Sequence, residues 1–112
     1  MLFEFVSSYA ESAALSAVWE EVTFVDDQLA DLRRSLTRVF EGSVAAELRL
    51  AARAGLIDEA VAGRATARAL TAMVDRWCWL TFVFDPPRDR PADPAEGAAL
   101  LARLWAGALG LS

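Results

Sequence analysis

The stretch Met73–Phe84, MVDRWCWLTFVF, decides how this chain can fold. It closes a predicted helix over residues 64–84, in which side chains three and four positions apart share a face. One face of that helix is apolar from end to end. The opposite face begins polar and then becomes apolar, in the order Arg64, Arg68, Thr71, Asp75, Cys78, Trp79, Phe82. Because a lone helix keeps one side in water, these last turns must be covered on both sides, and we expect a second copy of the chain to supply part of that cover.

The composition indicates one small domain with more apolar sequence than its own core needs. Of the 112 residues, 55 % are hydrophobic before the 6 glycines are counted, whereas about 45–50 % is usual with glycine included. Because a domain of this size has much surface, the excess indicates an oligomer or an apolar pocket. The net charge of −5 argues against direct binding to nucleic acid. All 11 basic residues are arginine, a bias that suggests a GC-rich bacterial genome.

Several features predict a cytoplasmic protein that does not enter a membrane. The single Cys78 cannot form an internal disulfide and suits a reducing compartment. The only charged residue near the start of the chain is the acidic Glu4, whereas a secretion signal begins with basic residues. The longest strongly apolar run, Trp77–Phe84, is far shorter than the roughly 20 residues that a bilayer requires.

Candidate catalytic and metal-binding groups are scarce. The sequence has no histidine and no glycine-rich phosphate loop, and Cys78 lies between two tryptophans, which favours a buried or interface hydrophobe over a catalytic thiol. Acidic residues gather at one helix junction, at Glu20, Glu21, Asp26 and Asp27. Because these acids straddle the junction, they do not converge as calcium ligands do. The sequence therefore predicts neither an enzyme nor a bound metal or cofactor.

Helical spacing predicts an all-α fold, an antiparallel bundle of about four main helices, with no competing strand signal. The expected helices cover residues 2–22, 27–54, 64–84 and 94–109, with a short helical segment near 58–63 and a proline-rich loop over 85–93. Asp26 is a good N-cap, and Gly55 fits the left-handed position after a helix. Asp93 and Pro94 form the strongest start signal in the chain, and Gly110 marks the end of the last helix.

Two of these helices carry polar residues where an apolar stripe is expected. One side of the first helix mixes rings and hydroxyls, namely Phe5, Ser8, Tyr9, Ser12, Ser16 and Trp19. That side is either a half-exposed amphipathic surface or the wall of a ligand pocket. In the second helix, Ser43 and Glu47 interrupt a line of leucines and valines. Glu47 either forms a structural salt bridge, with Arg76 for example, or lies at an exposed end, or supplies with Ser43 the polar end of a cavity.

The last helix is apolar nearly all round, which matches the two-sided end of the helix before it. We expect these two helices to pair with their symmetry mates as a four-helix contact in a two-fold dimer. The predicted interface residues are Trp79, Phe82, Val83, Ala98, Leu101 and Trp105.

The run LTAMVDRWCWLTFVF, with LRLAARAGLIDEAV before it and LLARLWAGALGL after the loop, resembles the C-terminal regulatory domain of TetR/AcrR-family transcriptional regulators. The matching pieces are Arg53-Ala54-Gly55, Asp58, Ala69–Val74 and Leu104–Gly110. Residues Tyr9–Glu21 are similar to the family's first sensor helices, so the resemblance covers almost the whole chain.

The resemblance implies a homodimer in which each subunit holds a hydrophobic small molecule and transmits its binding to two DNA-binding heads. In the family those heads are N-terminal helix-turn-helix units, and this sequence shows no basic recognition helix. Met1 already lies within the part that corresponds to the regulatory domain. We therefore expect contact with DNA only through a missing N-terminal domain, the chain being either a fragment or the product of a gene that starts downstream of that domain.

The expected ligand cavity lies between the first three long helices. Its apolar lining is predicted to include Phe5, Tyr9, Trp19, Phe40, Val44, Leu70, Met73 and Trp77. Its polar contacts are predicted to come from Ser12, Ser43 and Glu47. For each aromatic residue, plain core packing is the alternative. The alternative function is a stand-alone helical homodimer that acts by protein–protein interaction, with the ring-and-hydroxyl side of the first helix facing a partner and no cavity.

Overall fold

The computed structural model describes residues 2–111, and helices account for most of them, which confirms the all-α fold. The elements are α1 (Leu2–Glu11), α2 (Ala13–Val25), α3 (Asp27–Arg53), the 3₁₀ turn η1 (Glu59–Val61), α4 (Arg64–Cys78), the π-helical segment η2 (Trp79–Phe84) and α5 (Pro94–Ala108). Within residues 2–111, no helix has the length and apolar character needed to cross a bilayer.

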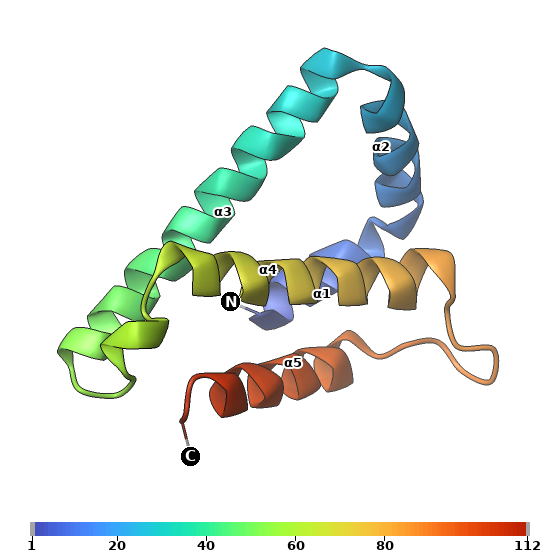
Figure 1. Ribbon diagram of the computed structural model, residues 1–112. Helices are drawn as coiled ribbons and strands as arrows, with labels where there is room; N and C mark the ends of the chain where they lie inside the picture. The colour runs from blue at the N-terminus through green and yellow to red at the C-terminus, as the bar shows by residue number, and fades with distance from the viewer. Residues whose placement is uncertain (1, 112) are drawn as a thin grey trace.

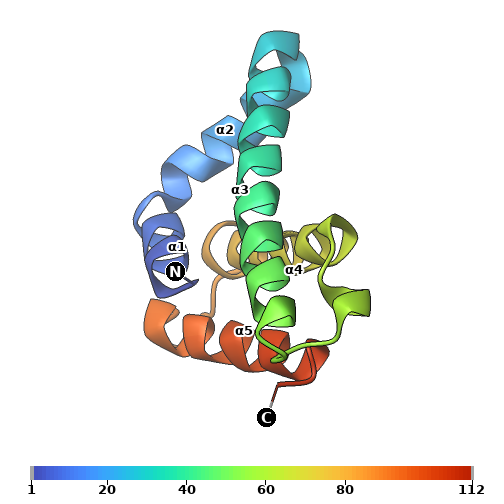
Figure 2. The same ribbon diagram turned by 90° about the vertical axis from the view of Figure 1, so that its left-hand side faces the viewer.

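The helices form a flat triangular frame with a fifth helix beneath it (Figure 1). In that view α3 is one side of the triangle, α2 is the second side, and α4 crosses the base with α1 behind it. Seen after a quarter turn, α5 runs below α1 and α4, and α3 rises far above them (Figure 2). The principal extents of 42 × 38 × 17 Å reflect this flat shape.

The predicted single helix over residues 2–22 is in fact two helices that meet at an angle at Ser12. The backbone of Ser12 leaves helical geometry, with φ −105° and ψ 21°, although the sequence there has neither glycine nor proline. α1 packs against α5, whereas α2 packs against α3 and η2. Because one straight helix cannot lie along both sets of partners, the bend comes from tertiary packing. α2 also continues to Val25, which leaves only Asp26 as the connection.

Local capping chemistry fixes the other boundaries. The Asp26 carboxylate accepts a hydrogen bond from the Leu29 N–H at 3.1 Å, which starts α3. After α3, Gly55 takes the left-handed backbone, with φ 77°, as predicted. The Asp93 carboxylate accepts from the Ala95 N–H at 2.9 Å, and Pro94 is the first residue of α5.

The predicted helix over residues 64–84 is continuous, but its last six residues widen into the π-helix η2. Its closing bond runs from the Asp85 N–H to the Leu80 carbonyl at 2.8 Å, a spacing of five residues. The two prolines that follow Asp85 then end the helix.

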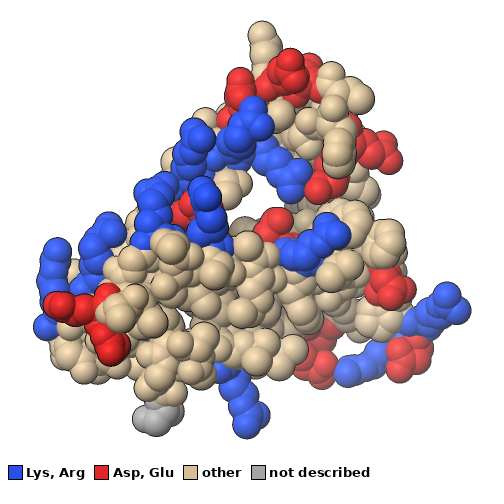
Figure 3. Space-filling view, viewed as in Figure 1, with Lys and Arg blue, Asp and Glu red and all other residues tan. Residues whose placement is uncertain are grey.

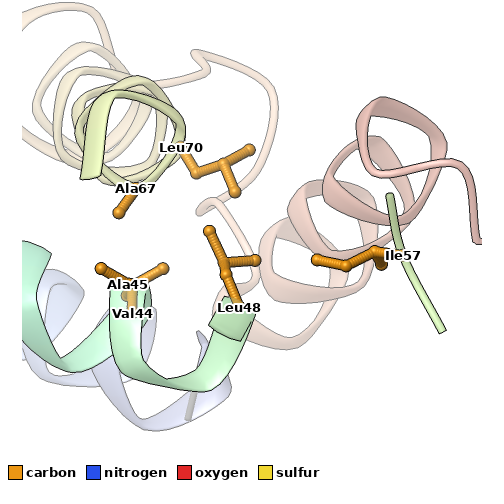
Figure 4. Close-up of a cluster of buried hydrophobic side chains, with 6 residues drawn as sticks. All are labelled: Val44, Ala45, Leu48, Ile57, Ala67 and Leu70. Atoms are coloured by element: carbon orange, nitrogen blue, oxygen red, sulfur yellow. The ribbon is translucent and has the colours of Figure 1, made fainter. Parts of the chain in front are cut away.

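Buried side chains form two clusters around the base of the triangle. The first joins α3 to α4 and consists of Val44, Ala45, Leu48, Ile57, Ala67 and Leu70 (Figure 4). The second joins α1, α4 and α5 and consists of Val6, Val74, Cys78, Ala98 and Leu101. Both clusters pack against Met73 and Trp105, so they make one continuous core along the base.

Candidate functional site

An open cavity of about 490 Å³ lies between α1, α3 and α4. The space-filling view shows the molecule hollowed between α3 and α2, above α4, with basic and acidic side chains around the hollow (Figure 3). The lining residues are Phe5 from α1, then Arg33, Leu36, Thr37, Phe40 and Glu41 from α3, and Arg68, Thr71, Ala72 and Asp75 from α4. This volume lies within the range of roughly 300–1,000 Å³ that is usual for small-molecule sites.

Two phenylalanines make the aromatic wall of the cavity. The rings of Phe5 and Phe40 lie with their centroids 5.2 Å apart at an angle of 33°. The ring of Tyr9 lies next to Phe5, with centroids 6.1 Å apart. Val6, the neighbour of Phe5, is fully buried against α4 and α5. Burial of Val6 therefore fixes α1, and this turns Phe5 toward α3.

A buried carboxylate lies at the crossing of α3 and α4. Glu41 is only 2 % exposed, and its Oε1 accepts a hydrogen bond from Arg68 Nε at 3.0 Å. The other oxygen, Oε2, has no hydrogen-bond partner among the described residues, and its nearest ion-pair contact is Arg64 Nε at 4.0 Å. A buried charge that loses its partner is strongly destabilising. Glu41 therefore ties the two helices together at the cavity and keeps one oxygen unsatisfied.

A second ion pair lies on the upper side of the cavity. Arg33 Nη1 is 2.6 Å from Glu20 Oε2, and Arg33 also donates to the hydroxyl of Thr23 at 3.4 Å. These contacts join α2 to α3. The guanidinium of Arg33 thus lines the cavity with its charge already matched by a carboxylate.

Asp75 is the lining carboxylate without such a match. Its side chain makes no hydrogen bond or ion pair with any residue in 2–111. Burial beside the cavity raises the pKa of Asp75; Arg33 and Arg76 oppose this change, and Glu20 adds to it. Burial also raises the pKa of Tyr9, with Asp75 contributing as a nearby negative charge. The Asp75 residue is nevertheless exposed to solvent, so it lies on the cavity wall as an accessible carboxylate without an ion-pair partner among the described residues.

The structure brings together only some of the residues expected at the cavity. Phe5 and Phe40 lie on its wall. Tyr9 lies against Phe5, and Trp19 is half-buried on α2. Others belong to the core along the base, namely Val44, Leu70, Met73 and Trp77. Ser12 is exposed at the bend between α1 and α2.

The expected polar end of the cavity requires a correction. Ser43 and Glu47 are exposed, so neither lies on the buried line of α3. The buried face of this part of α3 consists of Glu41, Val44, Ala45 and Leu48. α4 packs on that face, and Ser43 and Glu47 lie on the neighbouring face of α3. The alanines beside Val44 make two neighbouring faces of α3 equally apolar. The sequence therefore does not show which of the two faces is buried.

Sequence reasoning missed the charged and hydroxyl-bearing part of the wall. Three of these residues, Arg68, Thr71 and Asp75, form the polar side that the sequence shows on the first half of the helix over residues 64–84. That polar side lines the cavity, with Thr71 buried and Arg68 and Asp75 also exposed to solvent. The position of Glu41 could also have been found from the sequence. It lies three and four positions before Val44 and Ala45 and four after Thr37, so it shares a helix face with them.

Two of the six predicted dimer residues are also corrected. Ala98 and Leu101 are buried in the chain's own core, under Val6 of α1. The sequence pattern could not show that α1 lies across α5 and covers this face. The other four, Trp79, Phe82, Val83 and Trp105, are half-buried. The large apolar side chains that η2 and α5 leave exposed are Leu80, Phe84, Leu100 and Leu104.

Cys78 is fully buried, as predicted, and burial raises its pKa to about 12. Among residues 2–111, no three acidic or sulfur-bearing side chains converge as metal ligands would. Comparisons with protein-family models, with curated proteins and with solved structures find no match to this chain.

Proposed function

We propose that this chain is the effector-sensing and dimerisation domain of a cytoplasmic, bacterial transcriptional regulator of the TetR/AcrR type. In this proposal a mainly hydrophobic small molecule binds in the cavity between α1, α3 and α4. The observation that supports it most directly is that cavity: about 490 Å³, with the rings of Phe5 and Phe40 on one side and a few polar groups on the other. Sites for small molecules typically have this mixture of apolar lining and few polar groups.

The frame also offers a way to transmit binding. The cavity wall combines α1 and α4, fixed in the core, with the middle of α3. A ligand that fits one spacing of these helices better than another shifts the equilibrium by the difference in affinity. In the proposed regulator that shift would change the distance between two DNA-binding heads joined to the N-terminal side of the chain.

Dimerisation is the second part of the proposal. Leu80 and Phe84 of η2 and Leu100 and Leu104 of α5 are large apolar side chains in contact with solvent, Phe84 at 67 %. A homodimer that covers these residues would remove them from water. We expect Leu104→Glu to give a monomer in analytical ultracentrifugation, because a charge would then be placed in the interface. The matched control, Arg103→Glu, changes an exposed charged neighbour and should remain dimeric; an unchanged Leu104→Glu dimer would contradict this interface.

Ligand binding is tested by filling the cavity. Ala72 is exposed and lines the cavity, whereas Ala69 is exposed on the same helix and does not. We expect apolar aromatic compounds to raise the melting temperature of the wild type and of Ala69→Phe, but not of Ala72→Phe, because the added ring occupies the site. Stabilisation of Ala72→Phe equal to that of the wild type would place the binding elsewhere. No stabilisation of the wild type by any compound would contradict the sensor function.

A stand-alone helical homodimer that acts through protein–protein contact is the second candidate. The observation that favours it is a set of strongly exposed apolar residues distributed along α2, namely Leu15, Val18, Phe24 and Val25. Exposed apolar surface of this kind can mark an interaction site. In contrast, Phe5, Tyr9 and Trp19, the surface first expected to face a partner, are all partly buried.

A further inference from the structure

We propose that the molecule bound in this cavity is an amphipathic organic cation, with an aromatic or aliphatic body and a protonated amine. This inference rests on the proposed ligand-sensing function and specifies the chemical class of the ligand. It is carried by the arrangement of charges on the cavity wall.

Both arginines on the wall already have carboxylate partners. Arg33 pairs with Glu20 at 2.6 Å, and Arg68 pairs with Glu41 at 3.0 Å. An anionic ligand would have to compete with these carboxylates for the guanidinium groups, or leave a carboxylate without its partner. Breaking the pair at Glu41 is especially costly, because that side chain is almost completely buried.

One acceptor group on the wall, in contrast, has no partner. The Asp75 carboxylate lines the cavity, is exposed to solvent and has no hydrogen-bond or ion-pair partner within residues 2–111. The Oε2 atom of Glu41 also has no hydrogen bond, but it is buried, and Arg64 Nε lies 4.0 Å from it. Carboxylates form their strongest hydrogen bonds with charged donors, so Asp75 is available to an ammonium group that enters the cavity. Among the charged lining residues, Asp75 alone has no ion-pair partner within the described part of the chain.

The rest of the wall fits the other end of such a ligand. The rings of Phe5 and Phe40 lie 5.2 Å apart on the α1 and α3 side, and Leu36 extends the apolar surface. An apolar body gains free energy by burial against these groups. Phenylalanine faces also attract a nearby ammonium, so the aromatic wall supports the same charge preference as Asp75.

Three ligands that share one body and differ only in the polar end test this inference: phenylbutylammonium, phenylbutanol and phenylbutyrate. Their affinities for the intact chain are measured by isothermal titration calorimetry at neutral pH and low ionic strength. We expect the ammonium compound to bind about tenfold tighter than the alcohol, a difference of about 1.4 kcal/mol, and the carboxylate to bind most weakly.

The variant Asp75→Asn should remove about tenfold of the ammonium affinity and leave that of the alcohol nearly unchanged, because only the charge is lost. Asp89→Asn is the matched control, since it makes the same change in the proline-rich loop, outside the lining. Circular dichroism of each variant confirms that the fold is intact.

The possible outcomes separate this inference from the proposed function. If the carboxylate compound binds tightest, or if all three bind equally, the cation preference is wrong, and the ligand-sensing function is unaffected. An ammonium preference that survives in Asp75→Asn but is lost in Asp89→Asn would place the cation outside the cavity and overturn the inference. If none of the three binds, the inference fails; the sensor function fails with it only if the wider set of apolar compounds also gives no stabilisation.

Discussion

The lower and the upper halves of the triangular frame are built in opposite ways. The lower half, which contains α1, α4, α5 and the end of α3, holds every buried side chain of the described residues. The upper half is α2 together with residues 27–40 of α3, and in it no residue is buried. Several of its apolar side chains lie almost entirely in solvent, with Phe24 and Val25 both 85 % exposed.

This difference shows that helix formation and helix packing are separate in this molecule. The upper half is helical because its caps and its alanine- and leucine-containing sequence favour helix. Within it, α2 and α3 are joined by polar contacts such as the Arg33–Glu20 pair, and ion pairs of this partly exposed kind contribute little to stability. The cavity lies where the two halves meet, so one of its walls belongs to the packed core and the other to the part of α3 without a buried residue.

The largest expected effect is a cavity made in the lower core. Leu101 is fully buried between α1 and α4, so Leu101→Ala should lower the free energy of unfolding by about 2–5 kcal/mol. Leu15→Ala removes the same atoms from a side chain that is 70 % exposed in the upper half, and should change stability by less than about 0.5 kcal/mol. Urea denaturation of both variants measures the contrast. Equal losses would show that the upper half is as well packed as the lower.

A smaller effect is expected where α5 approaches α4. A Cβ atom on Gly97 would lie 2.5 Å from the nearest ring carbon of Trp77, too close to be accommodated without movement. Gly97→Ala should therefore destabilise the chain by about 1–3 kcal/mol, despite the better helix propensity of alanine. Gly42→Ala is the control, because its Cβ would meet only Arg64 at 3.7 Å, an ordinary contact. It should stabilise by up to about 1 kcal/mol, and a loss there would show that α3 is also closely packed.

Local chemistry explains which parts of the fold could be predicted from the sequence. The ends of α3 and α5 depend on Asp26, Gly55 and Asp93, whose effect reaches only a few residues, and these boundaries agree with the prediction. The bend at Ser12 depends on what α1 and α2 pack against, and no helix-breaking residue near it predicts the bend. The burial of Leu101 under α1 is missed for the same reason.

The cavity was predictable only in part. The expectation of a cavity near Phe5 and Phe40 follows from rings at helical spacing, and the structure places both rings on its wall. The polar side was assigned to Ser43 and Glu47, although Glu41 and Asp75 supply it. A carboxylate that faces a cavity and one that faces bulk water look alike in a sequence, because the difference is made by helices far away along the chain.

The cavity wall should also give a modest dependence of stability on pH. Burial raises the pKa of Asp75, with Arg33, Glu20 and Arg76 modifying the effect, so the folded chain takes up a proton more readily than the unfolded chain. The free energy of unfolding should therefore fall as the pH rises from about 4, the unfolded value, through the raised pKa of Asp75. Asp75→Asn should remove this fall and be more stable than the wild type at neutral pH. Chemical denaturation at several pH values measures it, and a wild type that gains stability over that window relative to the variant would contradict it.

The smallest effect is expected at the tip of the upper half. Phe24 is 85 % exposed, so Phe24→Ser removes almost no buried surface and should change the free energy of unfolding by less than about 0.5 kcal/mol. The wild type and the variant should also have the same mass in analytical ultracentrifugation. A loss above about 1 kcal/mol, or a change in mass, would mean that this tip is covered in solution by another copy of the chain. The comparison between the halves would then hold only for the single chain. The stand-alone homodimer that acts by protein–protein contact would then be favoured over the ligand-sensing domain.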